Sequence, residues 1–368
     1  MDPNRRASWL VRPDVGHRDW VDFAKGLAIV LVAYFHAVLM LRTVEVDSGG
    51  GRLKVLLEMF PMPTFFIIAG LFSARLLTWT LSEAWRRRIL LYLYLYALWS
   101  VIRFVFYWIV PGASGEVGEI SAQNPLGLAA ILVWPSSSYW FIYALAIFTF
   151  VTWAIRRLPV WVQITSAAVI SSLFSSGLIN TTNVGWNRIG AYLVFFVAGV
   201  HFSKWIVRAA PKARWWHVVA FGAGALAVVA LLLLLRGTHI PGLALIGQVC
   251  AVGLGIAVSV QLVRVRPLAF VSHLGANSYQ IYLIHLFVIA ASVVLVSLVA
   301  GDHTPRIVAL LLSVTVAAVA IYLSLVIARL TRRFSWLYVL PRRRSRRPRS
   351  TSGAPDPSPA ASETRAAP

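Results

Sequence analysis

Residues 18–42 read RDWVDFAKGLAIVLVAYFHAVLMLR, a long apolar run with a few ionisable side chains. Such a run is long enough to cross the hydrocarbon core of a bilayer as an α-helix. Helical residues turn by about 100° each, so Asp22, Lys25 and His36 share one face, with Lys25 and His36 roughly 16 Å apart along the axis. Ionisable groups are costly in hydrocarbon. We therefore expect this stripe to face a protein interior or a water-filled cavity, which makes it the first place to look for chemistry.

The composition indicates a membrane protein with several spans. The chain has 368 residues, of which 59% are hydrophobic and 13% are charged. Soluble domains are roughly half apolar and about a quarter charged. The first apolar run is too long for the apolar region of a signal peptide, and no small-residue cleavage site follows it. We therefore expect it to be retained as a span.

The formal net charge is +21, and the chain holds a single cysteine, Cys250. Most of the lysines and arginines lie in short segments between apolar runs and in the tail, as expected of charges that set topology. Anionic membrane lipids are therefore the expected partners of the basic surface, and nucleic acid is not. One cysteine excludes an intramolecular disulfide or a cysteine metal site.

Runs of about twenty apolar residues predict an all-α, polytopic transmembrane bundle. The fourth run is overlong and is interrupted at Trp134, Pro135 and the serines that follow, which predicts a half-inserted segment before a span that starts at Tyr139. The ten predicted spans are 21–41, 56–76, 89–110, 128–155, 159–179, 188–204, 216–235, 240–263, 276–299 and 307–328.

The charges of the connections predict the orientation of the bundle. Alternate connections are rich in lysine and arginine, whereas the opposite set holds only Arg42, Arg52, Lys54, Arg188, Arg236 and Arg306. This asymmetry predicts an even number of spans with both termini cytoplasmic, in the cell (plasma) membrane. The predicted organisation is a cytoplasmic segment over 1–20, a transmembrane domain over 21–330, and a basic, Pro/Ala/Ser-rich tail over 341–368 that cannot bury a core and is expected to be disordered.

His36 and Arg103 are the first two candidates for chemistry inside the membrane. A neutral imidazole at His36 can take a proton from a hydroxyl, although a packing histidine bonded to a neighbouring helix has the same sequence signature. Arg103 lies deep in the third span, at a depth comparable to His36. Its guanidinium could stabilise an oxyanion or hold an acidic acceptor, and a structural link to a helix terminus or loop is an equal alternative.

The consecutive arginines Arg86, Arg87 and Arg88 precede the third span on the predicted cytoplasmic side. Guanidinium groups bind phosphates bidentately, so such a cluster suits an anionic ligand. Taken alone, the cluster is better explained by ordinary positive-inside topology. Lys25, a further cation inside the membrane, favours anion binding.

The ninth span contains LGANSYQIYLIH, in which Ser278, Tyr282 and His285 are spaced by four and three residues on one helix face. These side chains predict either a polar lining for an acceptor or acyl channel, or helix packing through interhelical hydrogen bonds. No spacing of His, Asp and Glu resembles a zinc site, and no phosphate-binding glycine loop or serine-nucleophile elbow is present. No metal is expected.

Taken in order, these stretches resemble membrane-bound acyltransferase family 3, whose members are ten-helix proteins that O-acylate sugars and other acceptors. The similar stretches are RDWVDFAKGLAIVLVAYFH, MPTFFIIAGLF, AWRRRIL, YLVFFVAGV and LGANSYQIYLIH. The resemblance implies that His36 is catalytic, and that Lys25 and Arg86 to Arg88 engage an acyl donor, typically acyl coenzyme A. Lys25 stands where the family has arginine, and the acidic residue that many relatives carry near YWFIYALAIF is absent.

The leading hypothesis is an integral membrane O-acyltransferase. It would move an acyl group, with acetyl expected, from cytoplasmic acyl-CoA (acetyl-CoA) to a hydroxyl of a glycan or lipid-linked acceptor, with no permanently bound cofactor. His36 would be the general base or a transient acyl carrier, and Asp22 would orient Lys25. The alternatives are a transporter or flippase whose path is formed by Lys25, Arg103, His36 and His285, and a non-catalytic membrane partner.

Overall fold

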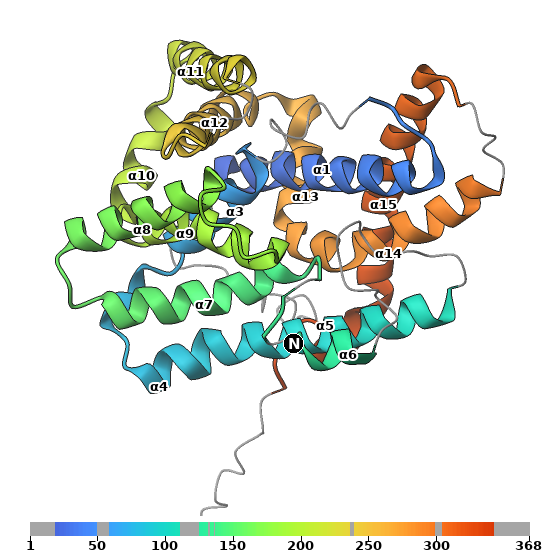
Figure 1. The fold of residues 1–368 in the computed structure, drawn as a ribbon, viewed down its shortest axis with the longest axis horizontal. Coiled ribbons are helices and arrows are strands. Elements are labelled where there is room, and N and C mark those ends of the chain that lie inside the picture. The colour runs from blue at the N-terminus through green and yellow to red at the C-terminus, as the bar shows by residue number, and fades with distance from the viewer. Residues whose placement is uncertain are drawn as a thin grey trace, which may run out of the picture.

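The computed structural model describes residues 19–49, 59–110, 125–131, 133–135, 137–235, 239–298 and 304–341. All regular elements within these residues are helical (Figure 1), which confirms the all-α part of the predicted fold class. Nearly all of the predicted amino-terminal segment and basic tail lies outside the described residues. The helices are α1 (Asp19–Leu41), α3 (Pro61–Leu71), α4 (Leu81–Ala84), α5 (Leu90–Ile109), α6 (Pro125–Ala129), α7 (Trp140–Ile155), α8 (Val160–Ser175), α9 (Val184–His201), α10 (Ser203–Ala209), α11 (Trp215–Leu234), α12 (Leu243–Leu262), α13 (Ala269–Ala276), α14 (Ser278–Ser297) and α15 (Arg306–Leu330).

Several of these helices are long and apolar enough to cross a membrane. Among the described residues six stretches are candidate membrane spans by their length and hydropathy. Helices α9 and α10, which are bent by 80° relative to each other, would form a seventh if they are one span. The shorter apolar helices α3, α7 and α8 occupy the other predicted stretches. Each of the ten apolar runs therefore contains a helix.

The predicted interruption of the fourth run is present in the structure. Helix α6 ends at Ala129 and α7 begins only at Trp140. The carbonyl group of Pro135 lies so close to Gly185, in the first turn of α9, that a Cβ atom there would clash with it. The indole nitrogen of Trp186 donates a hydrogen bond to the carbonyl oxygen of Val133 at 2.9 Å. The segment before α7 is thus held against the start of α9.

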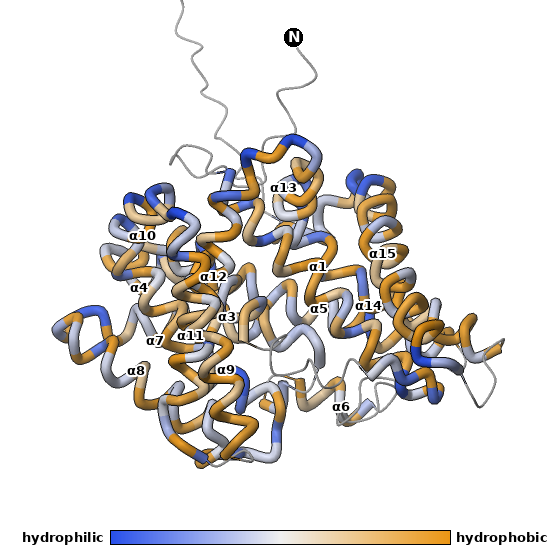
Figure 2. The backbone as a smooth tube through the Cα atoms, turned by 90° about the horizontal axis from the view of Figure 1, so that it is seen from above, coloured by the Kyte–Doolittle hydropathy of each residue, from blue (hydrophilic) through white to orange (hydrophobic). Residues whose placement is uncertain are grey.

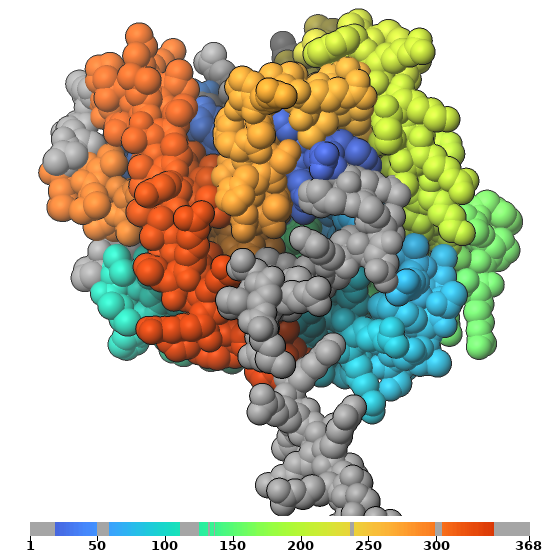
Figure 3. Space-filling view, turned by 180° about the vertical axis from the view of Figure 1, so that it is seen from behind, coloured from blue at the N-terminus to red at the C-terminus, as the bar shows by residue number. Residues whose placement is uncertain are grey.

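Helix α1 lies in the middle of the bundle. It packs against α3, α12, α13, α14 and α15 (Figure 1). From behind, residues of α1 show only as small blue patches between the residues of later helices (Figure 3). This enclosed position places the polar stripe of α1 inside protein, as expected of ionisable groups within a membrane.

The closest approach of α1 to a neighbour is at its crossing with α13. A Cβ atom on Gly26 would clash with the carbonyl oxygen of Val271, and one on Gly275 would clash with the carbonyl oxygen of Asp22. Small residues at such crossings let backbones come into contact, which is how helices associate where lipid supplies no hydrophobic driving force. The crossing therefore fixes α13 against the amino-terminal end of α1.

A second glycine crossing joins α3 to α9. Gly70 lies against the backbone of Gly199, and a Cβ atom on either residue would meet the carbonyl oxygen of a residue on the other helix. Beside it the Phe66 ring, which is fully buried, lies 4.9 Å from the Phe148 ring of α7. The two phenylalanine and glycine stretches of the sequence, MPTFFIIAGLF and YLVFFVAGV, thus meet as a packing unit.

The outer surface of the bundle is apolar. Hydrophobic residues run along most of the length of the helices, and hydrophilic residues gather near ends such as those of α10 and α13 (Figure 2). Helix α11 exposes large side chains, among them Leu234, which is 78% exposed. An apolar surface of this extent is unstable in water and is suited to lipid.

We predict that Gly275→Ala destabilises the protein because the new methyl group forces α13 away from α1. The expected loss is about 3 kcal/mol in the free energy of unfolding. Gly222→Ala on α11 is the matched control, since its Cβ atom would lie at an ordinary 3.7 Å from Leu254. Thermal unfolding in detergent measures both variants, and equal midpoints would contradict the tight crossing.

Candidate active site

Two of the predicted site residues meet at the contact between α1 and α14. The rings of His36 and His285 have centroids 5.4 Å apart, with an angle of 57° between their planes. His285 is fully buried, and His36 is partly buried beside the ring of Phe35 at 5.6 Å. Sequence analysis placed each histidine on its own helix but contained no signal that the two rings are neighbours.

The hydrogen bonds of His285 determine which of its nitrogens carries the proton. Its Nδ1 atom lies 2.8 Å from the carbonyl oxygen of Tyr282 and 3.0 Å from that of Ile281. A carbonyl oxygen only accepts, so Nδ1 is the donor and the neutral ring has its lone pair on Nε2. Nε2 lies on the side of the ring away from these carbonyl groups and is therefore the basic atom of His285.

The polar face of α14 is fixed by reciprocal hydrogen bonds with the segment before α7. The Tyr282 hydroxyl donates to the carbonyl oxygen of Ser138 at 2.7 Å, and the Tyr139 hydroxyl donates to that of Leu283 at 2.8 Å. Ser278 is buried in the first turn of α14. Of the two interpretations of this face, the geometry of Tyr282 is that of interhelical packing, and it holds α14 in one rotation about its axis.

Asp22 and Lys25 form an ion pair near the amino-terminal end of α1. The Lys25 ammonium lies 2.7 Å from a carboxylate oxygen of Asp22, one helical turn away, and both side chains are largely buried. A largely buried ammonium needs such a partner. Asp22 therefore sets the position of Lys25, as the spacing of three residues predicts.

The three consecutive arginines lie on a π-helical turn, Trp85–Ile89, between α4 and α5, and they point to different partners. Arg88 donates to the carbonyl oxygen of Phe72 and to the Tyr92 hydroxyl, both at 3.0 Å. Arg87 pairs with Glu83 at 3.1 Å. Arg86 is exposed, and among the described residues it makes no hydrogen bond or ion pair. The turn thus contains one structural arginine, one surface ion pair and one cation available to a ligand.

Arg103 lies on α5 with its guanidinium carbon 5.1 Å from the centroid of the Tyr107 ring, one turn further along. Tyr107 is buried and Arg103 is half-buried. A cation placed over an aromatic face is stabilised by the ring quadrupole. This contact lies within α5, so both interpretations of Arg103 stay predictions.

The residues after α15 contribute to the bundle in a way that sequence analysis missed. A turn at Ser335–Leu337 lies against α5, where the carbonyl oxygens of Trp336 and Leu337 accept hydrogen bonds from Tyr94 and Trp99. Tyr338 follows, and burial raises the pKa of its phenol. The available signal was the pair of aromatic residues in SWLY (335–338), because a solvated polar tail is not expected to contain rings that can be buried.

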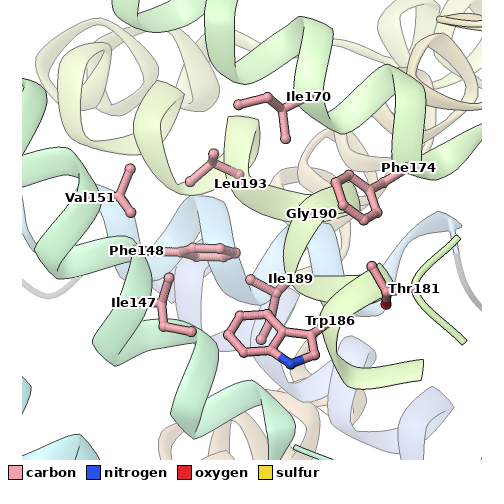
Figure 4. A pocket seen from close by; sticks show the side chains of 10 residues that line it. All are labelled: Ile147, Phe148, Val151, Ile170, Phe174, Thr181, Trp186, Ile189, Gly190 and Leu193. Atoms are coloured by element: carbon pink, nitrogen blue, oxygen red, sulfur yellow. The ribbon is translucent and has the colours of Figure 1, made fainter. Parts of the chain in front are cut away.

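An apolar pocket of about 250 Å³ lies between α7, α8 and α9 (Figure 4). Phe148, Phe174 and Leu193 are among the side chains around it. The ring of Phe174 packs directly against Gly190, where a Cβ atom would clash with it. None of the predicted site residues lines this pocket. Its apolar walls lack groups for acid, base or anion chemistry, so the candidate site remains the histidine contact.

Metal chemistry has no candidate ligand set in the part of the chain that the structure describes. There, no group of three or more His, Cys, Asp or Glu side chains could hold an ion. The histidine contact instead offers a base inside a helical membrane bundle, with an ion pair and a basic turn on neighbouring segments. The fold is that of a helical membrane protein, and its candidate site brings two imidazole rings into contact.

Comparison with known proteins then identifies the family. The family model described as an acyltransferase domain, of acyltransferase family 3, matches residues 18–329 and so covers most of the chain. The chain belongs to this family, and the protein is a membrane acyltransferase. Comparisons with curated proteins and with solved structures returned no match.

We predict that Arg88→Ala destabilises the protein, because it removes two hydrogen bonds that join the arginine turn to the end of α3 and to Tyr92. Loss of charged hydrogen bonds should cost about 2–3 kcal/mol. Arg86→Ala, its matched control, should leave thermal unfolding unchanged. Equal stability of the two variants would show that the three arginines are interchangeable surface charges.

Proposed function

We propose that the protein transfers an acyl group, with acetyl expected, from cytoplasmic acyl-CoA to a hydroxyl of a glycan or lipid-linked acceptor. Membership of the acyltransferase family supports the class of reaction. The observation that carries the proposal is His36, an imidazole inside an apolar bundle whose ring contacts a second histidine. A neutral imidazole is the side chain best suited to take a proton from a hydroxyl near neutral pH.

In this reaction His36 takes the hydroxyl proton as the acceptor oxygen attacks the thioester carbonyl carbon. The carbon–sulfur bond breaks, its electron pair leaves with sulfur, and the thiolate takes up the proton from His36. The ring returns to its neutral form and the acceptor leaves as an ester. In the alternative route His36 carries the acyl group transiently, with the same overall balance.

The donor's anionic head would be held on the cytoplasmic side. Arg86 is available there, and Lys25 adds a positive charge that Asp22 keeps in place. Helical geometry puts Lys25 roughly 16 Å from His36 along the axis of α1. That separation is of the order needed for an extended thioester arm, so an anchored donor could present its acyl group at His36.

The proposed orientation follows from the charges of the connections. Both termini would be cytoplasmic, with ten apolar segments embedded in the plasma membrane and the basic face against anionic lipids. In this orientation α1 runs outward. Lys25 then lies near the donor side, and His36 lies in the outer half of the membrane, within reach of an acceptor.

His36→Ala should abolish acyl transfer, since it removes the imidazole that takes the hydroxyl proton in the proposed reaction. With purified protein, labelled acetyl-CoA and cell-envelope glycans and lipids as acceptors, we expect a loss of at least about 100-fold. His201→Ala is the matched control, because His201 is bonded to Gln163 and lies outside the site. Retained transfer in His36→Ala would remove the assignment, and acceptor movement without any thioester would favour a transporter.

Arg86→Glu should weaken donor binding without changing the chemical step. The variant reverses a charge that meets the donor's phosphates, so the KM for acetyl-CoA should rise by about tenfold while kcat stays close to wild type. The effect should shrink as salt is added, because exposed charges are screened. A KM that is unchanged at low salt would place the donor elsewhere.

A further inference from the structure

The rings of His36 and His285 are in contact, at a separation from which a small rotation can bring two ring nitrogens within hydrogen-bond distance. A direct hydrogen bond between two imidazole nitrogens holds the ring centroids about 5 to 5.5 Å apart. The observed separation is 5.4 Å, with the planes inclined by 57°. Rings that merely pack also lie at this distance. The protonation of His285 shows which direction a hydrogen bond between the two rings can take.

His285 is arranged to accept a hydrogen bond rather than to donate one. Its Nδ1 proton is committed to the carbonyl oxygens of Ile281 and Tyr282, in its own helix. Nε2 therefore has the lone pair, on the edge of the ring that faces away from these carbonyl groups. Because α14 is clamped to the segment before α7 through Tyr139 and Tyr282, this ring cannot turn freely.

The proposed reaction creates a need for such an acceptor. When His36 takes the hydroxyl proton it becomes an imidazolium in a region of low dielectric, where an unsolvated charge is costly. A hydrogen bond accepted from a charged donor is about twice as strong as a neutral one. His285 contributes such a bond without any rearrangement of its helix.

We propose that His285 is a positioning residue whose Nε2 atom accepts a hydrogen bond from the imidazolium that forms on His36. This inference rests on the proposed function. The proton stays on His36 until the leaving thiolate takes it, so no further reactant is needed. In the resting state the His36 ring packs against His285, which restricts its orientation.

Two variants of His285 separate this role from simple packing. His285→Asn keeps an amide nitrogen near the position of Nδ1 and removes the acceptor at Nε2. His285→Gln places an amide oxygen near the position of Nε2, where it can accept a hydrogen bond. We expect His285→Asn to lower kcat by about 10- to 100-fold and to leave the KM for acetyl-CoA within about twofold, whereas His285→Gln retains kcat within about fivefold.

The measurement is kcat and KM per mole of monodisperse protein, with the midpoint of thermal unfolding recorded for each variant. His201→Asn, which removes a part-buried histidine contact elsewhere, is the control and should leave kcat unchanged. Wild-type kcat in His285→Asn, or equal losses in His285→Asn and His285→Gln, would overturn the proposal. Activity in His36→Ala would instead overturn the proposed function, so the two failures are distinguishable.

Discussion

The backbone contact between Gly26 of α1 and Gly275 of α13 is the constraint on which the candidate site depends. Neither position has room for a Cβ atom, so the two helices cannot shift past each other without a clash. His36 lies ten residues beyond Gly26, and His285 lies ten residues beyond Gly275. At 1.5 Å per helical residue His36 lies about 15 Å along α1 from the crossing, and α14, which begins at Ser278 just after α13, brings the ring of His285 into contact with it.

Other contacts keep this register from being lost further along the helices. The hydroxyls of Tyr139 and Tyr282 clamp α14, and the carbonyl oxygens of Trp336 and Leu337 hold the residues after α15 against α5. On the other side, the Gly70 and Gly199 crossing joins α3 to α9. Lipid provides no hydrophobic driving force for helix association. The helices are therefore held together by close glycine contacts and by side-chain hydrogen bonds to carbonyl oxygens.

The sequence predicted what depends on local periodicity. Apolar runs located the ten longer helices within about five residues, Pro135 predicted the break before α7, and helical spacing predicted the contact of Asp22 with Lys25, whereas the short helices α4, α10 and α13 were not predicted. It could not predict contacts that depend on how distant helices cross. The separate partners of Arg87 and Arg88 belong to that class, because a π-helical turn that rotates consecutive side chains leaves no signature in three arginines.

The sequence could not predict the pairing of His36 with His285 either, because the two helices are far apart in sequence. Their relative position depends on Gly26 and Gly275, whose close contact appears only when the helices are packed. In the same way, the phenylalanine and glycine stretches were recognisable as motifs, yet their mutual contact was not. Family membership explains why these stretches occur together, and the structure gives the physical reason, which is the close packing of α3 against α7 and α9.

The register of α1 and α14 can be measured directly by cross-linking. In a Cys250→Ser background, His36→Cys with His285→Cys should be joined by the shortest bifunctional methanethiosulfonate, and proteolysis followed by mass spectrometry should recover the linked peptides. Phe148→Cys with Phe196→Cys, whose rings lie 5.8 Å apart, is the positive control. Efficient linkage at the histidine positions is the predicted result. Linkage of the control pair alone would contradict the register, and with it the shared site.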